Sequence, residues 1–336
     1  MDAIVLVGGQ GRRLRPLTST RHKSLVPVLN RPAIDYLLDW LERSGIDRVV
    51  LALGQANEDL VATYPAGKRG AIEIVPILER ERLESGGAIR HAVRTAGIEG
   101  RFVVLNGDVY VDFDFHAAFQ AHVGFGADLT LALHEEEDPS AFGVAVVDAE
   151  GLVTGFVEKP PRGEAPSRLV NAGVWIFEPG LADEIPPGAV RVEETLFPSL
   201  VARRRRVLGY RFEGHWADLG TPQRYLGLSR ELLGRDNAIS SDAHIAPGAD
   251  IMGSAVGAGC QIGDGARVID SILWEGVEVE ADATVERCIL ADGVVVGAGA
   301  RAGGVIAGKG ARIAPGTIVP AETLIETGGR YDGTYG

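Results

Sequence analysis

The sequence predicts two folded parts, an α/β domain over residues 1–236 and a parallel β-helix over residues 237–336. Two observations lead to this prediction. Up to about residue 212, short strand-like aliphatic runs alternate with segments whose apolar residues recur at helical spacing. After about residue 236 the helical pattern stops, and glycine, alanine and aliphatic residues recur at intervals near six.

Three strand-like runs organise the first part. Helical segments between them make successive βαβ units, which predict a mostly parallel sheet covered on both faces. In such a sheet the ligand crevice lies at the carboxyl ends of the strands. The three runs are AIVLV at 3–7, VVLAL at 49–53 and FVVLN at 102–106.

The connecting helices show an apolar stripe. Ile34, Leu37 and Leu41 lie one helical turn apart, so one face of this segment is expected to pack on a core. Gly45 follows and is expected to end the helix. A second helix is predicted over 86–96, before the third strand.

The second part has the short repeat that is typical of a β-solenoid. A helix over 221–234 is expected to link it to the first part, and each later strand is expected to bury one aliphatic residue in a column. The spacing slips at Ile272 and Val277. A left-handed coil is implied by resemblance to hexapeptide-repeat proteins. The residues that mark the phase are Ile245, Ile251, Val256, Ile262 and Val268.

Composition excludes several classes of protein. The 336 residues are 46% apolar, enough for a sizeable core, and the formal charge of −13 argues against a nucleic-acid partner. Cys260 and Cys288 are too few for a disulfide framework, and no zinc-ligand spacing occurs. We expect a cytoplasmic protein without a signal peptide or a membrane span. The arginine run 203–206 is expected to be a solvated edge.

A glycine-rich loop follows the first strand. Gly8, Gly9 and Gly11 stand among arginines in GGQGRRLRPLT, at the predicted crevice. Glycines let backbone N–H groups approach a phosphate, and arginines add bidentate contacts to its oxygens. Taken alone, the glycines would also suit a tight turn. The dinucleotide fingerprint fails because Leu14 stands where its third glycine belongs.

The longer string GGQGRRLRPLTSTRHKSLVPVLNRP at 8–32 resembles the signature of the nucleoside-diphosphate-sugar pyrophosphorylases. The resemblance implies a Rossmann-like nucleotidyltransferase domain in which the three glycines bind the nucleotide. It also implies that Arg13 and Lys23 are catalytic, holding the triphosphate and helping pyrophosphate to leave. The sequence departs from the signature at His22 and Ser24, which replace two prolines.

The same resemblance implies a magnesium site. In LNGDVY, Asp108 follows Gly107 at the end of the third strand; an acid at that place could also simply cap or turn the chain. By resemblance Gly107 contacts the nucleotide and Asp108 binds Mg²⁺. Asp218 in WADLGTP matches the family's second metal ligand. Two carboxylates with water and phosphate oxygens suit Mg²⁺.

A further group is implied to bind the sugar phosphate. Glu158 and Lys159 lie in VEKP, where an adjacent acid and base more often face solvent. By resemblance the glutamate binds sugar hydroxyls and the lysine holds the phosphate. Asn171 in NAGVWIF and Gly143 in AFGVAVVD match other sugar contacts of the family. We assign Glu193 no role.

The implied partners are an NTP and a sugar 1-phosphate, which give an NDP-sugar and pyrophosphate. The signature and the repeat region most resemble mannose-1-phosphate guanylyltransferases, so GTP and mannose 1-phosphate are expected. Glucose 1-phosphate with dTTP or UTP is the alternative. Glu84, in the segment LESGGAIRHAV, replaces the first glycine of the family's base-pocket motif and leaves the choice of base open.

Two alternative functions, a non-catalytic subunit and an acyltransferase, stay open. Some relatives of the family are non-catalytic sensing or scaffold subunits, although Arg13, Lys23 and both aspartates argue for catalysis. Hexapeptide β-helices also carry acyltransferases with a histidine base, but in the repeat region of this sequence only His244 is a candidate. For the β-helix itself we expect a role in forming a homo-oligomer.

Overall fold

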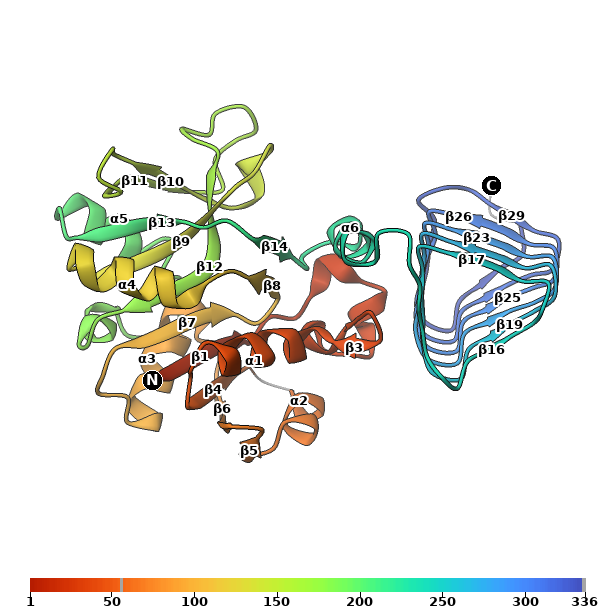
Figure 1. Ribbon diagram of the computed structural model, residues 1–336, viewed down its shortest axis with the longest axis horizontal. Helices are drawn as coiled ribbons and strands as arrows, with labels where there is room; N and C mark the ends of the chain where they lie inside the picture. The colour runs from red at the N-terminus through yellow and green to blue at the C-terminus, as the bar shows by residue number, and fades with distance from the viewer. Residues whose placement is uncertain (55–56, 334–336) are drawn as a thin grey trace. The chain divides into compact units, whose positions relative to one another are not determined.

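The computed structural model describes residues 1–54 and 57–333 (Figure 1). Its residues fall into two compact units that do not follow the order of the chain. The first unit comprises Met1–Gly9 and Ile34–Trp216; the second comprises Gln10–Ala33 and the chain from Ala217 onward. The boundary expected between residues 236 and 237 stays a prediction.

A ten-stranded sheet forms the centre of the first unit. Its main path runs β11-β10-β12-β7-β1-β4-β6-β5, with β9 paired to β12 and to β13. The strands are β1 Asp2–Val7, β4 Arg48–Leu53, β5 Gly67–Arg69, β6 Ile72–Leu78, β7 Phe102–Asn106, β9 Leu129–Glu135, β10 Gly143–Val147, β11 Val153–Glu158, β12 Leu169–Phe177 and β13 Val207–Arg211.

The three predicted strands are adjacent and parallel. β1 pairs with β4 on one side and with β7 on the other, and Leu6 is in register with both Ala52 and Asn106. The carboxyl ends of the three strands therefore meet at one edge of the sheet, as expected for a βαβ arrangement. On its far side β7 pairs antiparallel with β12, so the sheet is mixed.

Helices pack against this sheet. The two predicted helices are confirmed as α1 and α3, and Gly45 follows α1 with a left-handed φ of 75°. The sheet and helices enclose a core that includes Trp175 and the stacked rings of Phe102 and Phe177. The helices are α1 Ala33–Arg43, α2 Glu58–Thr63, α3 Glu84–Ala96, α4 Phe115–Phe125 and α5 Leu196–Ala202, with 3₁₀ turns η4 Pro139–Ala141 and η5 Leu181–Glu184 and the short strands β8 Val109–Asp112 and β14 His215–Asp218.

The arginine run at 203–206 lies at the surface, and two of its members pair with acids. Arg205 binds Asp128 and Glu184, and Arg203 also binds Glu184. The hydrogen bond to Asp128, opposed by desolvation, raises the pKa of Arg205 and lowers that of Asp128. The positive charge of these two arginines is therefore partly offset by Asp128 and Glu184.

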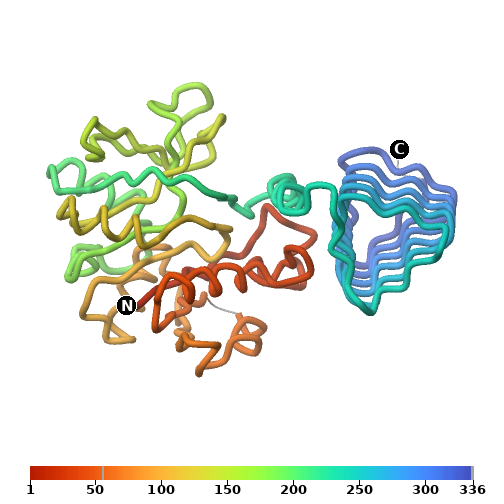
Figure 2. Tube along the Cα trace, in the orientation of Figure 1, coloured from red at the N-terminus to blue at the C-terminus, as the bar shows by residue number. Residues whose placement is uncertain are grey.

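The second unit contains α6, Pro222–Leu233, and a parallel β-helix. Figure 2 shows its stacked coils, whose three sides are three parallel sheets. Sheet one holds β15 Ala238–Ile239, β18 Ala255–Val256, β21 Ile272–Leu273, β24 Ile289–Leu290, β27 Ile306–Ala307 and β30 Leu324–Ile325; sheet two holds β16 His244–Ile245, β19 Gln261–Ile262, β22 Glu278–Val279, β25 Val295–Val296, β28 Arg312–Ile313 and β31 Arg330–Tyr331; sheet three holds β17 Asp250–Met252, β20 Arg267–Ile269, β23 Thr284–Glu286, β26 Arg301–Gly303 and β29 Ile318–Val319.

The coil length explains the slip in the sequence pattern. Equivalent residues of successive coils lie 17 positions apart, one fewer than three six-residue steps, so the phase moves once in each of these coils. The last coil is one residue longer, with Ile306 paired to Leu324. Leu273, not Ile272, is therefore the strand residue of β21 that lies in the interior core. A hydrogen-bonded column repeats at the same interval, with Ser254, Ser271 and Cys288 each accepting from the backbone N–H of the next coil.

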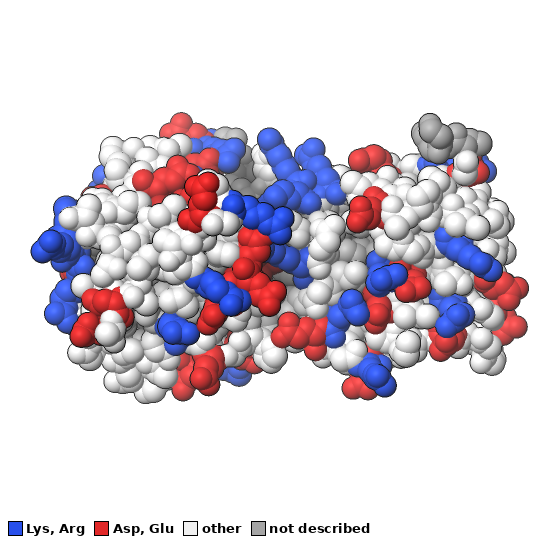
Figure 3. Space-filling view, turned by 90° about the horizontal axis from the view of Figure 1, so that it is seen from above, with Lys and Arg blue, Asp and Glu red and all other residues white. Residues whose placement is uncertain are grey.

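Both cysteines are buried in the β-helix as free thiols. Burial raises the pKa of Cys260 and of Cys288 to about 11, so neither is a ready thiolate near neutral pH. On the visible face of the β-helix, acidic and basic side chains alternate in small groups (Figure 3). Among the described residues, no helix is long and apolar enough to cross a membrane.

Candidate functional site

The glycine-rich loop leaves the sheet directly after β1. A Cβ on Gly8 would lie 3.6 Å from the backbone nitrogen of Gly54, and a Cβ on Gly54 would lie 2.9 Å from the carbonyl oxygen of Gly8. A side chain at position 54 would therefore collide with the backbone of Gly8, whereas one at position 8 would make only an ordinary contact. At Gly9 a Cβ would meet nothing within 4 Å, so this position opens onto free space.

Glu79, which was not predicted from the sequence as a site residue, lies beside this loop. It follows β6 and is 8% exposed, with its Oε2 accepting a hydrogen bond of 3.2 Å from the N–H of Leu83. Its Oε1 lies 3.9 Å from where a Cβ on Gly8 would be. Burial raises the pKa of Glu79. An acid directly after the partly buried strand β6, near the carboxyl end of β1, was the signal that could have found it.

Gly107 places Asp108 at the end of β7. The N–H of Gly107 donates to the carbonyl oxygen of Leu6 at 2.9 Å, and a Cβ on Gly107 would lie 2.9 Å from that oxygen. No side chain fits between β7 and β1 at this point. The aspartate therefore leaves the sheet at the carboxyl edge of two central strands.

Strand register brings three predicted sugar-site residues together. β10 and β11 pair antiparallel with Gly143 opposite Glu158, and a Cβ on Gly143 would lie 2.8 Å from Oε2 of Glu158. The next residue, Lys159, has a left-handed φ of 48° and its Nζ lies 2.7 Å from Oε1 of Glu158. The carboxylate and the ammonium thus form one polar group above a glycine.

Asn171 lies on β12 and is 9% exposed. Its Oδ1 accepts hydrogen bonds from Nε1 of Trp175 at 2.7 Å and from the N–H of Gly173 at 3.1 Å. The side-chain oxygen is therefore already occupied by hydrogen bonds within the protein. Any sugar contact by this residue would go through its amide nitrogen.

A second acid that the sequence analysis left without a role lies near the sugar-site group. Glu193 accepts a hydrogen bond of 2.6 Å from the hydroxyl of Ser85, whose oxygen accepts from the N–H of Val192. Burial raises the pKa of Glu193, with a smaller contribution from the negative charge of Glu158. Ser85 and Glu193 thus join the segment that starts α3 to the chain at 190–193.

Glu84 adopts a backbone conformation that favours glycine. Its φ is 57°, in the left-handed region, and its carboxylate pairs with the exposed Arg82 at 2.7 Å. Gly86 and Gly87 keep their places because side chains there would meet Val190 and Gly188. The segment therefore combines two close backbone approaches with a left-handed residue at position 84, a conformation that glycine adopts most readily.

The signature loop, defined here as residues 10–32, belongs to the second unit. Gly11 has a φ of 58°, its carbonyl accepts from the hydroxyl of Thr18 at 2.7 Å, and a Cβ on it would lie 3.1 Å from Cβ of Lys23. Gly11 therefore brings Lys23, which is 8% exposed, against the start of the loop. The elements of the loop are η1 Arg12–Leu14, η2 Leu17–Ser19, η3 Lys23–Leu25, β2 Pro27–Val28 and β3 Arg31–Pro32.

The two departures from the signature form a cap of their own. The ring Nδ1 of His22 accepts a hydrogen bond of 3.1 Å from the N–H of Ser24, at the start of the 3₁₀ turn that carries Lys23. This side-chain acceptor holds the turn that the family's two prolines would stiffen by restricting φ.

Arg13 and Asp218 meet at Gly220, all within the second unit. A Cβ on Gly220 would lie 2.8 Å from Nη2 of Arg13 and would contact Oδ1 of Asp218. That oxygen accepts from the N–H of Gly220 at 3.1 Å and from Nη1 of Arg224 at 3.1 Å. Glycine at 220 leaves room for the guanidinium beside the carboxylate. Arg224 was not anticipated from the sequence.

The predicted magnesium ligands are divided between the units, Asp108 in the first and Asp218 in the second. Within the described ranges, no three acidic, histidine or cysteine residues form a metal cage. Two carboxylates alone fit an ion that takes its remaining oxygen ligands from water and phosphate, which is how Mg²⁺ is commonly held. Each of the two aspartates is therefore chemically suited to a magnesium ion that arrives with the substrate.

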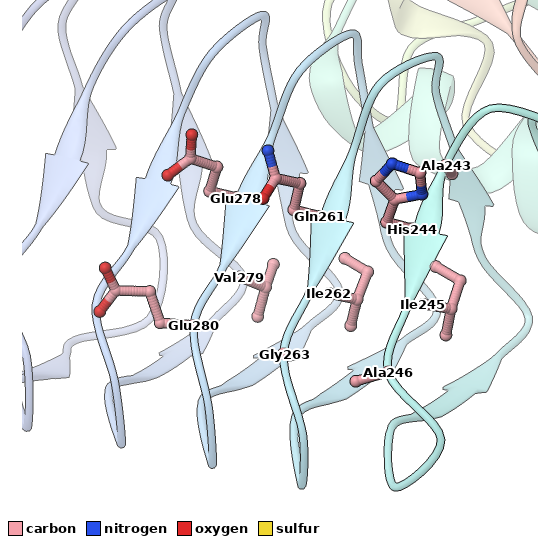
Figure 4. Close-up of a pocket in the computed structure, with 10 residues that line it drawn as sticks. All are labelled: Ala243, His244, Ile245, Ala246, Gln261, Ile262, Gly263, Glu278, Val279 and Glu280. Carbon is pink, nitrogen blue, oxygen red and sulfur yellow. The ribbon is translucent and has the colours of Figure 1, made fainter.

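The β-helix carries a surface depression of about 580 Å³ along sheet two. Figure 4 shows successive strands presenting His244, Gln261 and Glu278 along it. None of the predicted site residues lines this depression. His244, the histidine considered above for an acyltransferase, is one of its lining residues.

Family models match nearly the whole chain. Residues 2–235 match the nucleotidyl transferase model, and residues 226–326 match the model of the LbH domain, a left-handed β-helix, of EIF2B subunit epsilon. The first model spans more than half of the chain. Together with the parallel coils described above, the second model confirms the predicted left-handed β-helix.

Curated relatives are about one-third identical to the chain over the residues that align. A putative mannose-1-phosphate guanyltransferase of Sulfolobus acidocaldarius is 33% identical over 234 residues, 69% of this chain and 63% of that protein. A mannose-1-phosphate guanylyltransferase of Mycobacterium tuberculosis is 32% identical over 275 residues, 76% of this chain and 74% of that protein. A UTP–glucose-1-phosphate uridylyltransferase of Synechocystis is 31% identical over 250 residues, 70% of this chain and 64% of that protein.

Among solved structures, HddC from Yersinia pseudotuberculosis complexed with GMP-PN is similar with a TM-score of 0.59. The match is 23% identical and covers 69% of this chain and 99% of HddC. At this identity the likeness concerns the fold alone.

Proposed function

Since the chain belongs to the nucleotidyl transferase family, a family of enzymes, we propose that it transfers a nucleotidyl group from an NTP to a sugar 1-phosphate and releases pyrophosphate. One observation carries this proposal. In the signature loop, Gly11 packs Lys23 against the loop start, and Gly220 leaves Arg13 beside the carboxylate of Asp218. One cation beside a potential metal ligand, with a second cation packed at the start of the same loop, suits a polyphosphate.

The reaction joins two anions. A phosphate oxygen of the sugar 1-phosphate attacks the α-phosphorus, and the bond to the β-phosphate oxygen breaks as pyrophosphate leaves in line. Repulsion and alignment set most of the barrier, so positioned positive charge is the main source of rate enhancement. The attacking phosphate is already ionised near neutral pH, so no general base is required.

The two groups of residues divide this work. Arg13 and Lys23 bind the triphosphate and offset the charge that develops on pyrophosphate. Lys159 binds the phosphate of the sugar, and Glu158, which already pairs with it, accepts from sugar hydroxyls. When bound through Asp108 and Asp218, Mg²⁺ would supply further charge neutralisation at the phosphates.

We propose GTP and mannose 1-phosphate as the substrates. The names of the Sulfolobus and Mycobacterium relatives favour this pair. Glu79 adds a chemical reason, because a carboxylate accepts from the N1–H and the amino group of guanine, whereas uracil and thymine offer one donor on that edge. The Synechocystis relative makes UTP with glucose 1-phosphate the alternative. A cytoplasmic location and homo-oligomerisation through the β-helix are further proposals.

The test is a panel of GTP, UTP, dTTP, ATP and CTP against mannose and glucose 1-phosphates, with pyrophosphate release as the measurement. We expect the highest kcat/KM for GTP with mannose 1-phosphate. Glu79→Gln keeps the size of the side chain but removes one acceptor, and is expected to lower the preference for GTP over UTP by about 10- to 100-fold. Absence of pyrophosphate release with every pair would overturn the proposed activity.

The control for base recognition is Glu81→Gln, an exposed acid two residues away. It is expected to leave the order of nucleotides unchanged. An equal loss for all nucleotides in Glu79→Gln would show that Glu79 supports the fold of the loop and does not read the base.

A further inference from the structure

The signature loop docks on sheet one of the β-helix. The β2–β3 hairpin ends in Leu29 and Asn30, both with positive φ, and its tip reaches the first coils. Nδ2 of Asn30 donates to the carbonyl oxygens of Ala238 on β15 and Val256 on β18, each at 2.9 Å. One side chain thus bridges two successive coils.

Arg21 makes a second attachment farther along the same sheet. Its Nη2 lies 3.2 Å from Oδ1 and 3.0 Å from Oδ2 of Asp292, the second residue after β24. Its guanidinium also lies 4.9 Å from the ring centroid of Trp274, which follows β21. The side chains of Arg21 and Asp292 are only 23% and 15% exposed, so solvent weakens this pair less than a surface ion pair.

Trp274 also connects the loop with α6. Its Nε1 donates to the hydroxyl of Tyr225 at 3.1 Å, and that hydroxyl donates to the carbonyl oxygen of Pro27 in β2. Trp274 is 2% exposed and Tyr225 is fully buried. The loop, α6 and the β-helix therefore share one buried polar chain.

Burial on the outer face of sheet one agrees with this docking. Leu273 and Leu290 belong to the interior of the solenoid, so the preceding Ile272 and Ile289 point outward. Both isoleucines are nevertheless 2% exposed. Pro16 of the signature loop is close enough that a Cβ on Gly308, in the turn after β27, would lie 2.9 Å from it.

We propose that the β-helix holds the signature loop in its working conformation, with Arg21, Asp292 and Trp274 as positioning residues for Arg13 and Lys23. The proposal rests on the nucleotidyl transfer proposed above for its kinetic consequence. The loop is built from 3₁₀ turns and a two-residue hairpin, which supply few regular hydrogen bonds of their own. External attachments therefore decide where its two cations lie. A displacement near 1 Å is enough to slow a reaction of this kind strongly.

Asp292→Asn tests the attachment without removing bulk. We expect kcat to fall by about 10- to 100-fold while KM for the sugar 1-phosphate stays within about twofold, because only the triphosphate side is displaced. Backbone amides of residues 10–32 should exchange faster with deuterium in the intact protein. Asp250→Asn, which removes an exposed β-helix ion pair with Arg267, is the matched control and should change neither readout.

Rescue separates positioning from general stability. Arg21→Lys keeps the charge but not the paired contacts, and should retain more activity than Arg21→Gln. The exchanged pair Arg21→Asp with Asp292→Arg should recover part of the activity lost in either single variant. Unchanged kcat together with unchanged exchange in Asp292→Asn would overturn the proposal.

The exchange measurement keeps this test distinct from the proposed reaction. If the unmodified protein releases no pyrophosphate with any substrate pair, the proposed function fails. Faster exchange confined to residues 10–32 in Asp292→Asn would still support the attachment, and unchanged exchange would still refute it.

Discussion

The sugar-side group of the first unit and the signature loop of the second unit are positioned in different ways. Gly143, Glu158 and Lys159 are placed by the register of two neighbouring strands, separated by a short turn in the chain. Arg21 in the signature loop is held by Asp292, a residue 271 positions away. The first arrangement is local, whereas the second needs the β-helix to be folded.

The two regions therefore depend to different degrees on the rest of the protein for their conformation. A hairpin fixes facing side chains once its strands pair. A loop made of turns takes its conformation from the surface to which it is attached. The sugar side should therefore tolerate changes in the β-helix, and the triphosphate side should not.

Arg13→Ala should have the largest effect, because it removes a cation from the side that depends on tertiary attachment. We expect kcat to fall by about 10²- to 10³-fold, as for the loss of one donor to a charge that develops in the transition state. Pyrophosphate release measures the effect, and circular dichroism should show an unchanged fold. The control is Arg12→Ala, whose Nε bonds to the side chain of Gln10 at 3.0 Å. Near-normal turnover in Arg13→Ala would refute the assigned role.

Lys159→Ala should have a smaller effect, confined to the locally built side. We expect KM for the sugar 1-phosphate to rise by about 10- to 100-fold, as for a lost hydrogen bond to a charged group, with KM for the NTP nearly constant. Initial rates at varied concentrations of each substrate test this split. Lys68→Ala, in the exposed edge strand β5, should change neither KM. An equal rise in both KM values would contradict the division of roles.

Glu84→Gly should have the smallest effect and should act on the backbone. Glycine adopts a φ of 57° more readily than glutamate, but it also makes the unfolded chain more flexible. The exposed pair with Arg82 contributes little. We expect the free energy of unfolding to change by less than about 1 kcal/mol, measured by urea denaturation. Glu84→Ala keeps the strain without the ion pair, so a loss larger in Glu84→Gly than in Glu84→Ala would contradict a strained backbone at this position.

Much of the fold was predictable because its signals are local. The runs at 3–7, 49–53 and 102–106 correspond to neighbouring strands β1, β4 and β7, and the six-residue texture identified a β-helix. The coil length was not predicted, since the shift of phase that reveals it occurs only once in 17 residues. Ile272 and Leu273 are both buried, so hydropathy does not tell which of them faces the interior.

Site residues were predictable where they belong to a sequence motif, but not where only a contact in the folded chain identifies them. Gly143 and Glu158 were named separately, and only the strand pairing shows them opposite each other. Glu79 and Arg224 match no motif of the signature, and their contacts with Gly8 and Asp218 are visible only in the folded chain. The nucleotide, sugar-phosphate and metal roles of the predicted residues stay predictions.

The 17-residue coil has a consequence for insertions and deletions. Asn30 contacts β15 and β18, while Arg21 reaches the end of β24, so the signature loop spans a fixed number of coils, each adding roughly 4.8 Å. Losing one coil between these points would preserve the solenoid yet leave the loop too long for its attachments. Coils after β27 carry no such constraint from Arg21 or Asn30. Length variation in the β-helix should therefore be tolerated near its C-terminal end and opposed across its first coils.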